Sequence, residues 1–199
     1  MFTGNRGCLV DDSGEVVRHH RGQLWITCIT EYKEWRFPLA RPGRWTPLFF
    51  LDDASALAAG HRPCGLCRRD TYLSYRDAVS RAARSPEPLR AEDLNRRLSA
   101  ERLTPGRGLD RAADRMVWTA ELDRLPAGTV IVDEERSPRL LLDDLLLTFT
   151  FAGWAKPQPR PDAGVVRVLT PPTSVAALCH GFRPALHPSA WGSDPAGPG

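Results

Sequence analysis

The chain reads DDASALAAGHRPCGLCRR over residues 52–69, and this stretch holds the most specific pattern in its sequence. The acidic start, the alanine-rich body and the terminal Gly60 are typical of a short helix with an N-cap and a glycine after its last turn. Pro63 disfavours helical geometry at the residue before it, so an extended link is expected there. Cys64 and Cys67 follow as a Cys-x-x-Cys pair at the start of a second helical pattern.

The cysteine pair predicts a zinc site. Two thiolates separated by two residues can bind one metal ion, and Zn²⁺ prefers such soft ligands in a tetrahedral arrangement. Cys8 and Cys28 lie on expected strands ahead of the motif, so we expect Cys8, Cys28, Cys64 and Cys67 to hold the ion together. Alternative ligands are His19, His20 and His61. Two other interpretations of the pair stay open: reduced thiols buried at a helix start, and a thioredoxin-like redox pair, although no βαβ pattern surrounds it.

Residues 49–68 resemble the zinc-binding domain, of the methylphosphotriester-acceptor type, of the Ada DNA-repair proteins. In that family an aromatic strand, a short alanine-rich helix and a Gly-Phe-Arg-Pro-Cys-x-x-Cys-type segment present two of four zinc thiolates. The matching positions here are Arg62, Pro63, Cys64 and Cys67, and His61 replaces the aromatic residue. The family's other ligand pair, a close Cys-x-x-x-Cys whose first member accepts a methyl group from DNA phosphotriesters, has no counterpart. The resemblance therefore implies a zinc-stabilised fold and an association with DNA, but no methyl acceptor.

Composition sets the class of protein. The chain has 199 residues, of which 42% are hydrophobic and 26% charged, so fibrous and fully disordered chains are excluded. No apolar run reaches the roughly 18 residues that a membrane-spanning helix needs, and no membrane partner is expected. The first residues lack the apolar core of a signal peptide, so we expect a cytoplasmic protein whose five cysteines are thiols or metal ligands.

The pattern of apolar residues predicts an α+β protein of two parts. Residues 1–85 are expected to form an Ada-like zinc module, with a hairpin over residues 23–39, a short helix, the Cys-x-x-Cys link and a longer helix. The Pro-rich segment at residues 85–88 marks the boundary. Residues 86–199 are expected to form a charged helix followed by short strands in a small antiparallel β unit.

Basic residues favour the first part of the chain. Residues 1–84 carry 13 Arg and Lys against 9 Asp and Glu, whereas the rest of the chain is nearly balanced. DNA is therefore the expected partner, because phosphates are contacted by arginines and bases stack on aromatic rings. The candidate phosphate contacts are Arg18, Arg21, Arg62, Arg69 and Arg76, with Trp25, Trp35 or Trp45 as stacking platforms.

The leading hypothesis is a zinc-stabilised nucleic-acid-binding protein, associated with DNA repair. One alternative is an enzyme with a site between the two parts, in which His19, His20 or His187 acts as acid or base. That alternative requires a pocket that brings one of these histidines to Arg62 or to the metal. Another alternative is a zinc-stabilised scaffold for protein partners, which would expose an apolar patch around Leu145–Trp154.

Overall fold

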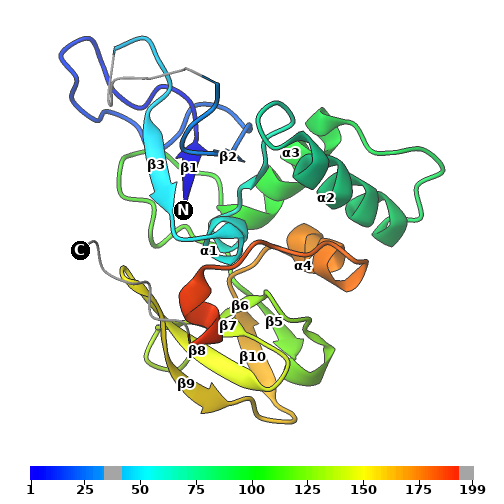
Figure 1. Cartoon of the computed structure of the whole chain (residues 1–199). Helices are drawn as coiled ribbons and strands as arrows, with labels where there is room; N and C mark the ends of the chain where they lie inside the picture. The colour runs from blue at the N-terminus through cyan, green and yellow to red at the C-terminus, as the bar shows by residue number, and fades with distance from the viewer. Residues whose placement is uncertain (34–41, 193–199) are drawn as a thin grey trace.

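A computed structural model describes residues 1–33 and 42–192 of the chain, which form a mixed α+β fold with two sheets. The two sheets lie at opposite ends of the molecule in Figure 1, and helices α1 and α4 lie between them. The helices are α1 (Asp53–Ala58), α2 (Arg69–Ala82), α3 (Ala91–Arg102) and α4 (Pro172–Cys179). The predicted α+β class is confirmed.

The first sheet has the strand order β3-β1-β2-β4. Its strands are β1 (Phe2–Asn5), β2 (Ile26–Cys28), β3 (Pro47–Phe50) and β4 (Arg62–Pro63). The central strand β1 is antiparallel to both neighbours, whereas β4 joins β2 in parallel. The extended link predicted before Cys64 is therefore a strand. The expected hairpin partner of β2, at residues 35–39, lies outside the described residues.

Helix α1 follows β3 directly and brings the chain back to the sheet. Asp52 is its N-cap: its side chain accepts a hydrogen bond from the Ser55 backbone, and the Ser55 hydroxyl accepts one from the Asp52 backbone. This capping box satisfies two backbone donors at the helix start. Gly60, with φ +79°, follows the last turn in the left-handed region, and its missing Cβ leaves room for the Arg102 side chain.

The second sheet has six antiparallel strands in the order β5-β10-β6-β7-β8-β9. The strands are β5 (Trp118–Glu121), β6 (Val130–Val132), β7 (Pro138–Leu141), β8 (Leu145–Thr150), β9 (Gly153–Pro159) and β10 (Val165–Val168). The predicted antiparallel unit is confirmed. Strand β9 contains Pro157 and Pro159 and lies at the sheet edge, where proline is tolerated.

The apolar cores cross the predicted boundary at residue 85. Ala54 and Ala58 of α1 pack with Val130 and Trp154 of the second sheet, and Tyr75 of α2 belongs to a cluster that includes α4. The second part therefore packs against the helices of the first, and the division at residue 85 stays a prediction. Among the described helices, none has the length and apolar composition to cross a bilayer.

Candidate metal centre

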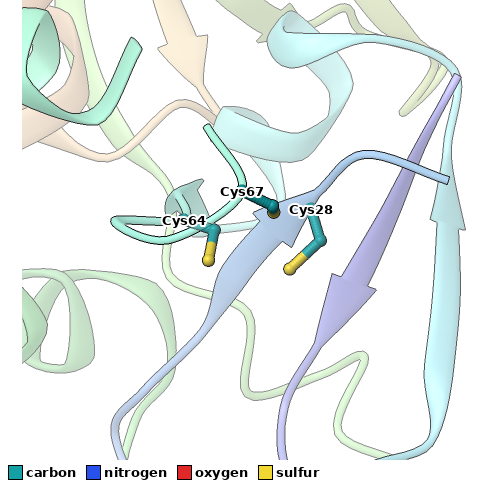
Figure 2. Close-up of side chains that lie close together, drawn as sticks. All are labelled: Cys28, Cys64 and Cys67. Atoms are coloured by element: carbon teal, nitrogen blue, oxygen red, sulfur yellow. The ribbon is translucent and has the colours of Figure 1, made fainter. Parts of the chain in front are cut away.

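Three cysteines come together at one end of the first sheet. Figure 2 shows Cys28 at the end of β2, with Cys64 and Cys67 on the neighbouring loop between β4 and α2. Their Sγ atoms lie within 4.8 Å of one another. Cys64 is buried, and the other two are half-buried. No other described His, Cys, Asp or Glu side chain places a ligand atom within that distance of all three sulfurs.

The parallel pairing of β2 with β4 brings these residues together. Thr27 is paired with Pro63, and the Cys64 backbone N–H donates to the Thr27 carbonyl at 2.9 Å. Cys28 and Cys64 therefore occupy equivalent positions just past this pair. The two residues between Cys64 and Cys67 turn the chain into α2, and the Leu66 N–H points at the Cys64 sulfur from 3.4 Å. Thirty-five residues separate Cys28 from Cys64, so only this pairing makes them neighbours.

The sulfur cluster favours one thiolate even without a metal. The neighbouring Cys28 thiol lowers the pKa of Cys64 to about 5, despite burial, and the backbone N–H groups of Cys67 and Leu66 act in the same direction. The pKa of Cys28 is raised, first by its interaction with Cys64 and then by burial. Burial is also the main cause of the raised pKa of Cys67. Crowded sulfurs that share protons in this way are suited to a cation that replaces those protons.

This cluster fits a zinc ion. With Zn–S bonds of ~2.3 Å, a tetrahedral ion keeps its sulfur ligands roughly 3.8 Å apart, and the three Sγ atoms already lie within 4.8 Å. Thiolates are soft ligands that select zinc over magnesium or calcium. The described part of the chain thus supplies three ligands from Cys28, Cys64 and Cys67.

Cys8 lies away from the cluster. Strand β1 is antiparallel to β2 with Thr3 opposite Cys28, so the chain moves away from Cys28 as it continues to Cys8. Asn5 is paired with Ile26, so Cys8 follows the end of β1 that lies away from Cys28. The Cys8 thiol instead donates to the Val10 carbonyl at 3.3 Å. Cys8 as the fourth ligand therefore stays a prediction that the described geometry does not favour, and the register of β1 is the physical reason.

The alternative histidine ligands also lie outside the sulfur cluster. His61 is fully buried, with its ring 5.2 Å from that of Trp25 and 4.6 Å from that of Phe50. His19 and His20 contact each other through their Nδ1 atoms at 3.0 Å, and both rings pack against Trp25. The three histidines and Trp25 form one aromatic cluster beside the first sheet.

The predicted phosphate contacts occupy different environments. Arg62 is only 4% exposed, its guanidinium bonds the Asn95 side chain and the Pro63 carbonyl, and it lies over the Tyr72 ring. It therefore acts inside the fold. Arg69 is exposed at the start of α2, and Arg76 lies on the same helix in an ion pair with Asp77.

Arg18 and Arg21 lie on the loop between β1 and β2. Arg21 is exposed, whereas Arg18 is half-buried and donates to the Cys8 carbonyl at 3.2 Å. They flank His19 and His20 and lie away from Arg69 and Arg76 along the sequence. Of the five predicted arginines, Arg21 and Arg69 are exposed, Arg18 and Arg76 are half-buried, and Arg62 is internal.

A cluster of arginines around Trp25 was missed by sequence reasoning. The guanidinium carbons of Arg6 and Arg102 lie 4.1 Å and 3.7 Å from the centre of the Trp25 ring. Arg115 joins them from the segment after α3, where it bonds the Arg102 carbonyl. These arginines are separated by about a hundred residues and belong to no motif, so no local pattern indicates their meeting.

The histidine-based enzyme site does not meet its stated requirement. His19 lines a pocket of about 480 Å³ with Arg6 and Arg115, but neither Arg62 nor a sulfur of the cluster is part of its wall. His187 lies elsewhere: its backbone N–H donates to Asp52, and its ring contacts Ser189. Neither the His19 pocket nor the contacts of His187 therefore include Arg62 or a candidate metal ligand.

The surface around residues 145–154 gives limited support to a docking scaffold. Phe151 is fully exposed at the turn between β8 and β9, and Leu145 is partly exposed. Trp154 is buried in the core, so it adds nothing to such a surface.

The chain matches no protein-family model, no curated protein and no solved structure.

Proposed function

We propose that this is a zinc-stabilised protein that binds nucleic acid next to its metal centre. The observation that carries the proposal is the convergence of Cys28, Cys64 and Cys67, whose sulfurs meet within 4.8 Å although two of them come from a distant part of the chain. Zinc bound by these thiolates fastens β2 to the start of α2. A structural zinc ion contributes on the order of 10 kcal/mol to the folding of a small domain.

Two features support nucleic acid as the partner. Arg69 and Arg76 lie seven residues apart on α2, so they share one face of the helix that begins two residues after Cys67. The first part of the chain carries an excess of basic residues, which suits the sequence-independent attraction of a phosphate backbone. The resemblance of residues 49–68 to the Ada zinc domain points in the same direction.

The metal part of the proposal is tested by elemental analysis of the purified full chain. We expect about one zinc per chain, with the metal lost when any one of Cys28, Cys64 or Cys67 is changed to Ser. A preparation that folds fully without any bound zinc would contradict this part of the proposal.

The nucleic-acid part is tested by fluorescence anisotropy of labelled single- and double-stranded DNA with the zinc-loaded protein over a range of salt concentrations. Affinity is expected to fall steeply with salt, because each phosphate contact releases counterions. The double change Arg69→Gln and Arg76→Gln should lower the magnitude of the slope of log K against log salt by about 2. The double change Arg96→Gln and Arg97→Gln, at two exposed arginines of α3, is the charge-matched control. Absence of binding at low salt would overturn this part.

A further inference from the structure

The pocket beside Trp25 is lined by positive charge. It has a volume of about 480 Å³ and opens between the N-terminal segment and residues 103–115. Its polar lining consists of Arg6, His19, Asp110, Arg111 and Arg115, together with the indole of Trp25. Asp110 is exposed, so it lies where water screens its charge. The pocket is distinct from the sulfur cluster, none of whose cysteines lines it.

Among the described residues, no carboxylate forms an ion pair with Arg6 or Arg115 of this pocket. Arg6 bonds only imidazoles, through Nε to His61 at 3.4 Å and through Nη1 to His19 at 3.0 Å. Arg115 bonds only backbone carbonyls, those of Ala58, Leu169 and Arg102.

The two neighbouring arginines differ in whether a carboxylate neutralises them. Arg102, which contacts Trp25, bonds the carbonyls of Gly60 and Gln23. Arg111 is the exception, because it forms an ion pair with Asp114. Three guanidinium groups therefore remain clustered without an anion.

Burial lowers the pKa of all three groups, and repulsion between their charges acts on Arg6 and Arg102. Burial, and after it the charge of Arg115, lowers the pKa of Arg6 to about 10. Burial, with the charges of Arg6 and Arg115, lowers the pKa of Arg102 to about 9, and burial alone lowers that of Arg115 to about 10. All three remain protonated at pH 7. Burial and the charge of Arg6 lower the pKa of His19 to about 4, so this imidazole is neutral and can accept the Arg6 hydrogen bond.

Trp25 adds an unused donor at the same place. Its side chain is 2% exposed, and its Nε1–H has no hydrogen-bond partner within the described part of the protein. A buried N–H without a partner costs about 1–3 kcal/mol, so native proteins usually supply one. Trp25 is part of the pocket wall, so a ligand that enters the pocket lies beside this indole.

We propose that this pocket binds a phosphate monoester through Arg6, Arg115 and the Trp25 indole. A monoester carries a charge near −2 at pH 7, whereas a phosphodiester carries −1, and clustered cations without carboxylate partners favour the more highly charged anion. The inference goes beyond the proposed function, since it requires neither zinc nor binding along a nucleic-acid backbone. Three sources present this chemistry: inorganic phosphate, a nucleoside 5′-monophosphate, and the phosphorylated 5′ end of an oligonucleotide.

Isothermal titration calorimetry on the full chain tests the proposal. The probes are inorganic phosphate, adenosine 5′-monophosphate, and matched oligonucleotides with and without a 5′ phosphate; cyclic adenosine monophosphate is the diester control. We expect the two monoesters and inorganic phosphate to bind at least tenfold more tightly than the diester. The tightest binder among these three probes identifies the source. Equal affinity for monoester and diester would overturn the proposal.

Variants locate the binding site. Arg6→Gln removes one charged donor and should weaken monoester binding tenfold or more, since a hydrogen bond to a charged group is among the strong ones. Arg97→Gln removes the same charge from the exposed face of α3, outside the pocket, and should leave it unchanged. Should Arg6→Gln fail to fold, monoester binding is measured with Trp25→Phe instead, because this change removes the indole N–H and keeps an aromatic ring. Unchanged monoester affinity in a folded Arg6→Gln or Trp25→Phe variant would contradict the proposed site.

Discussion

The two sheets of this protein have interiors of different chemistry. The six-stranded sheet contributes to two apolar clusters, with Leu140, Leu141 and Val168 completely buried. In the four-stranded sheet, the described residues 1–33 contribute no member to any of the three apolar clusters. The large side chains buried beside it are Trp25, His61 and Arg102.

This difference shows how each sheet can be stabilised. Burial of a Leu or Val side chain contributes about 1.5–3 kcal/mol, and the second sheet has many such residues. The first sheet is small, and its described residues 1–33 join no apolar cluster, so it must depend on a few directional interactions. Two are visible: the sulfur cluster, and the buried ion pair of Arg68 with Asp53, in which Arg68 also donates to Thr27 of β2. Loss of one directional interaction should therefore have a larger effect on the first sheet than loss of one apolar side chain has on the second.

The largest effect is expected from loss of the metal. Cys64→Ser removes the most buried ligand and should abolish zinc binding, with a loss of stability of the first sheet on the order of 10 kcal/mol. We expect residues 1–68 to become sensitive to protease, while the six-stranded sheet keeps its protection in hydrogen–deuterium exchange.

The matched control for this prediction is Cys179→Ser. Cys179 is an exposed thiol at the end of α4, outside the sulfur cluster. It should retain one zinc per chain and unchanged stability. Equal protection of both sheets in the Cys64→Ser variant would show that the first sheet does not depend on the metal.

A smaller effect is expected from breaking the buried ion pair. Asp53→Asn leaves the Arg68 guanidinium buried without its carboxylate, and such a loss costs about 3–5 kcal/mol. Asp53 also accepts from the Ala185 backbone, so this change weakens the link between α1 and the C-terminal segment. Urea unfolding gives the measurement. Arg96→Gln, which breaks a largely exposed pair with Asp93, should change stability by less than about 1 kcal/mol. Similar losses in the two variants would argue against the buried pair as a structural link.

In the second sheet, one apolar truncation should act on stability alone. Leu140→Ala creates a cavity in a core where Leu140 is fully buried, with a cost of about 2–5 kcal/mol. The zinc content should stay at its wild-type value, because β7 has no contact with the sulfur cluster. Loss of zinc together with stability would mean that the two sheets unfold as one unit, and the contrast between them would disappear.

Local sequence patterns predict the elements of this fold better than its long-range contacts. The capping residues of α1, the Cys-x-x-Cys turn and the β-branched runs of the second sheet are each encoded within a few residues, and all three form as expected. Strand β1 carries no such pattern, since Phe2–Asn5 contains a glycine and an asparagine. It forms because β2 and β3 both pair with it, which is a property of the tertiary fold.

The same difference between local patterns and long-range contacts determines which residues of the candidate site the sequence could predict. The spacing of Cys64 and Cys67 predicts them as ligands, but whether Cys8 and Cys28 both reach them depends on strand register, which spacing does not determine. The arginines around Trp25 come from three segments, so only the folded chain shows that their charges meet.

The smallest effect, and the sharpest test of the register, is expected from Cys8. Its thiol contacts the Val10 carbonyl, and serine can make the same hydrogen bond. Cys8→Ser should therefore retain one zinc per chain and change stability by less than about 1 kcal/mol, whereas Cys28→Ser should lose the metal. Elemental analysis and urea unfolding of the two variants give the comparison. Loss of zinc in Cys8→Ser would place a fourth thiolate at the ion, and β1 would then have to leave its pairing with Thr3 opposite Cys28.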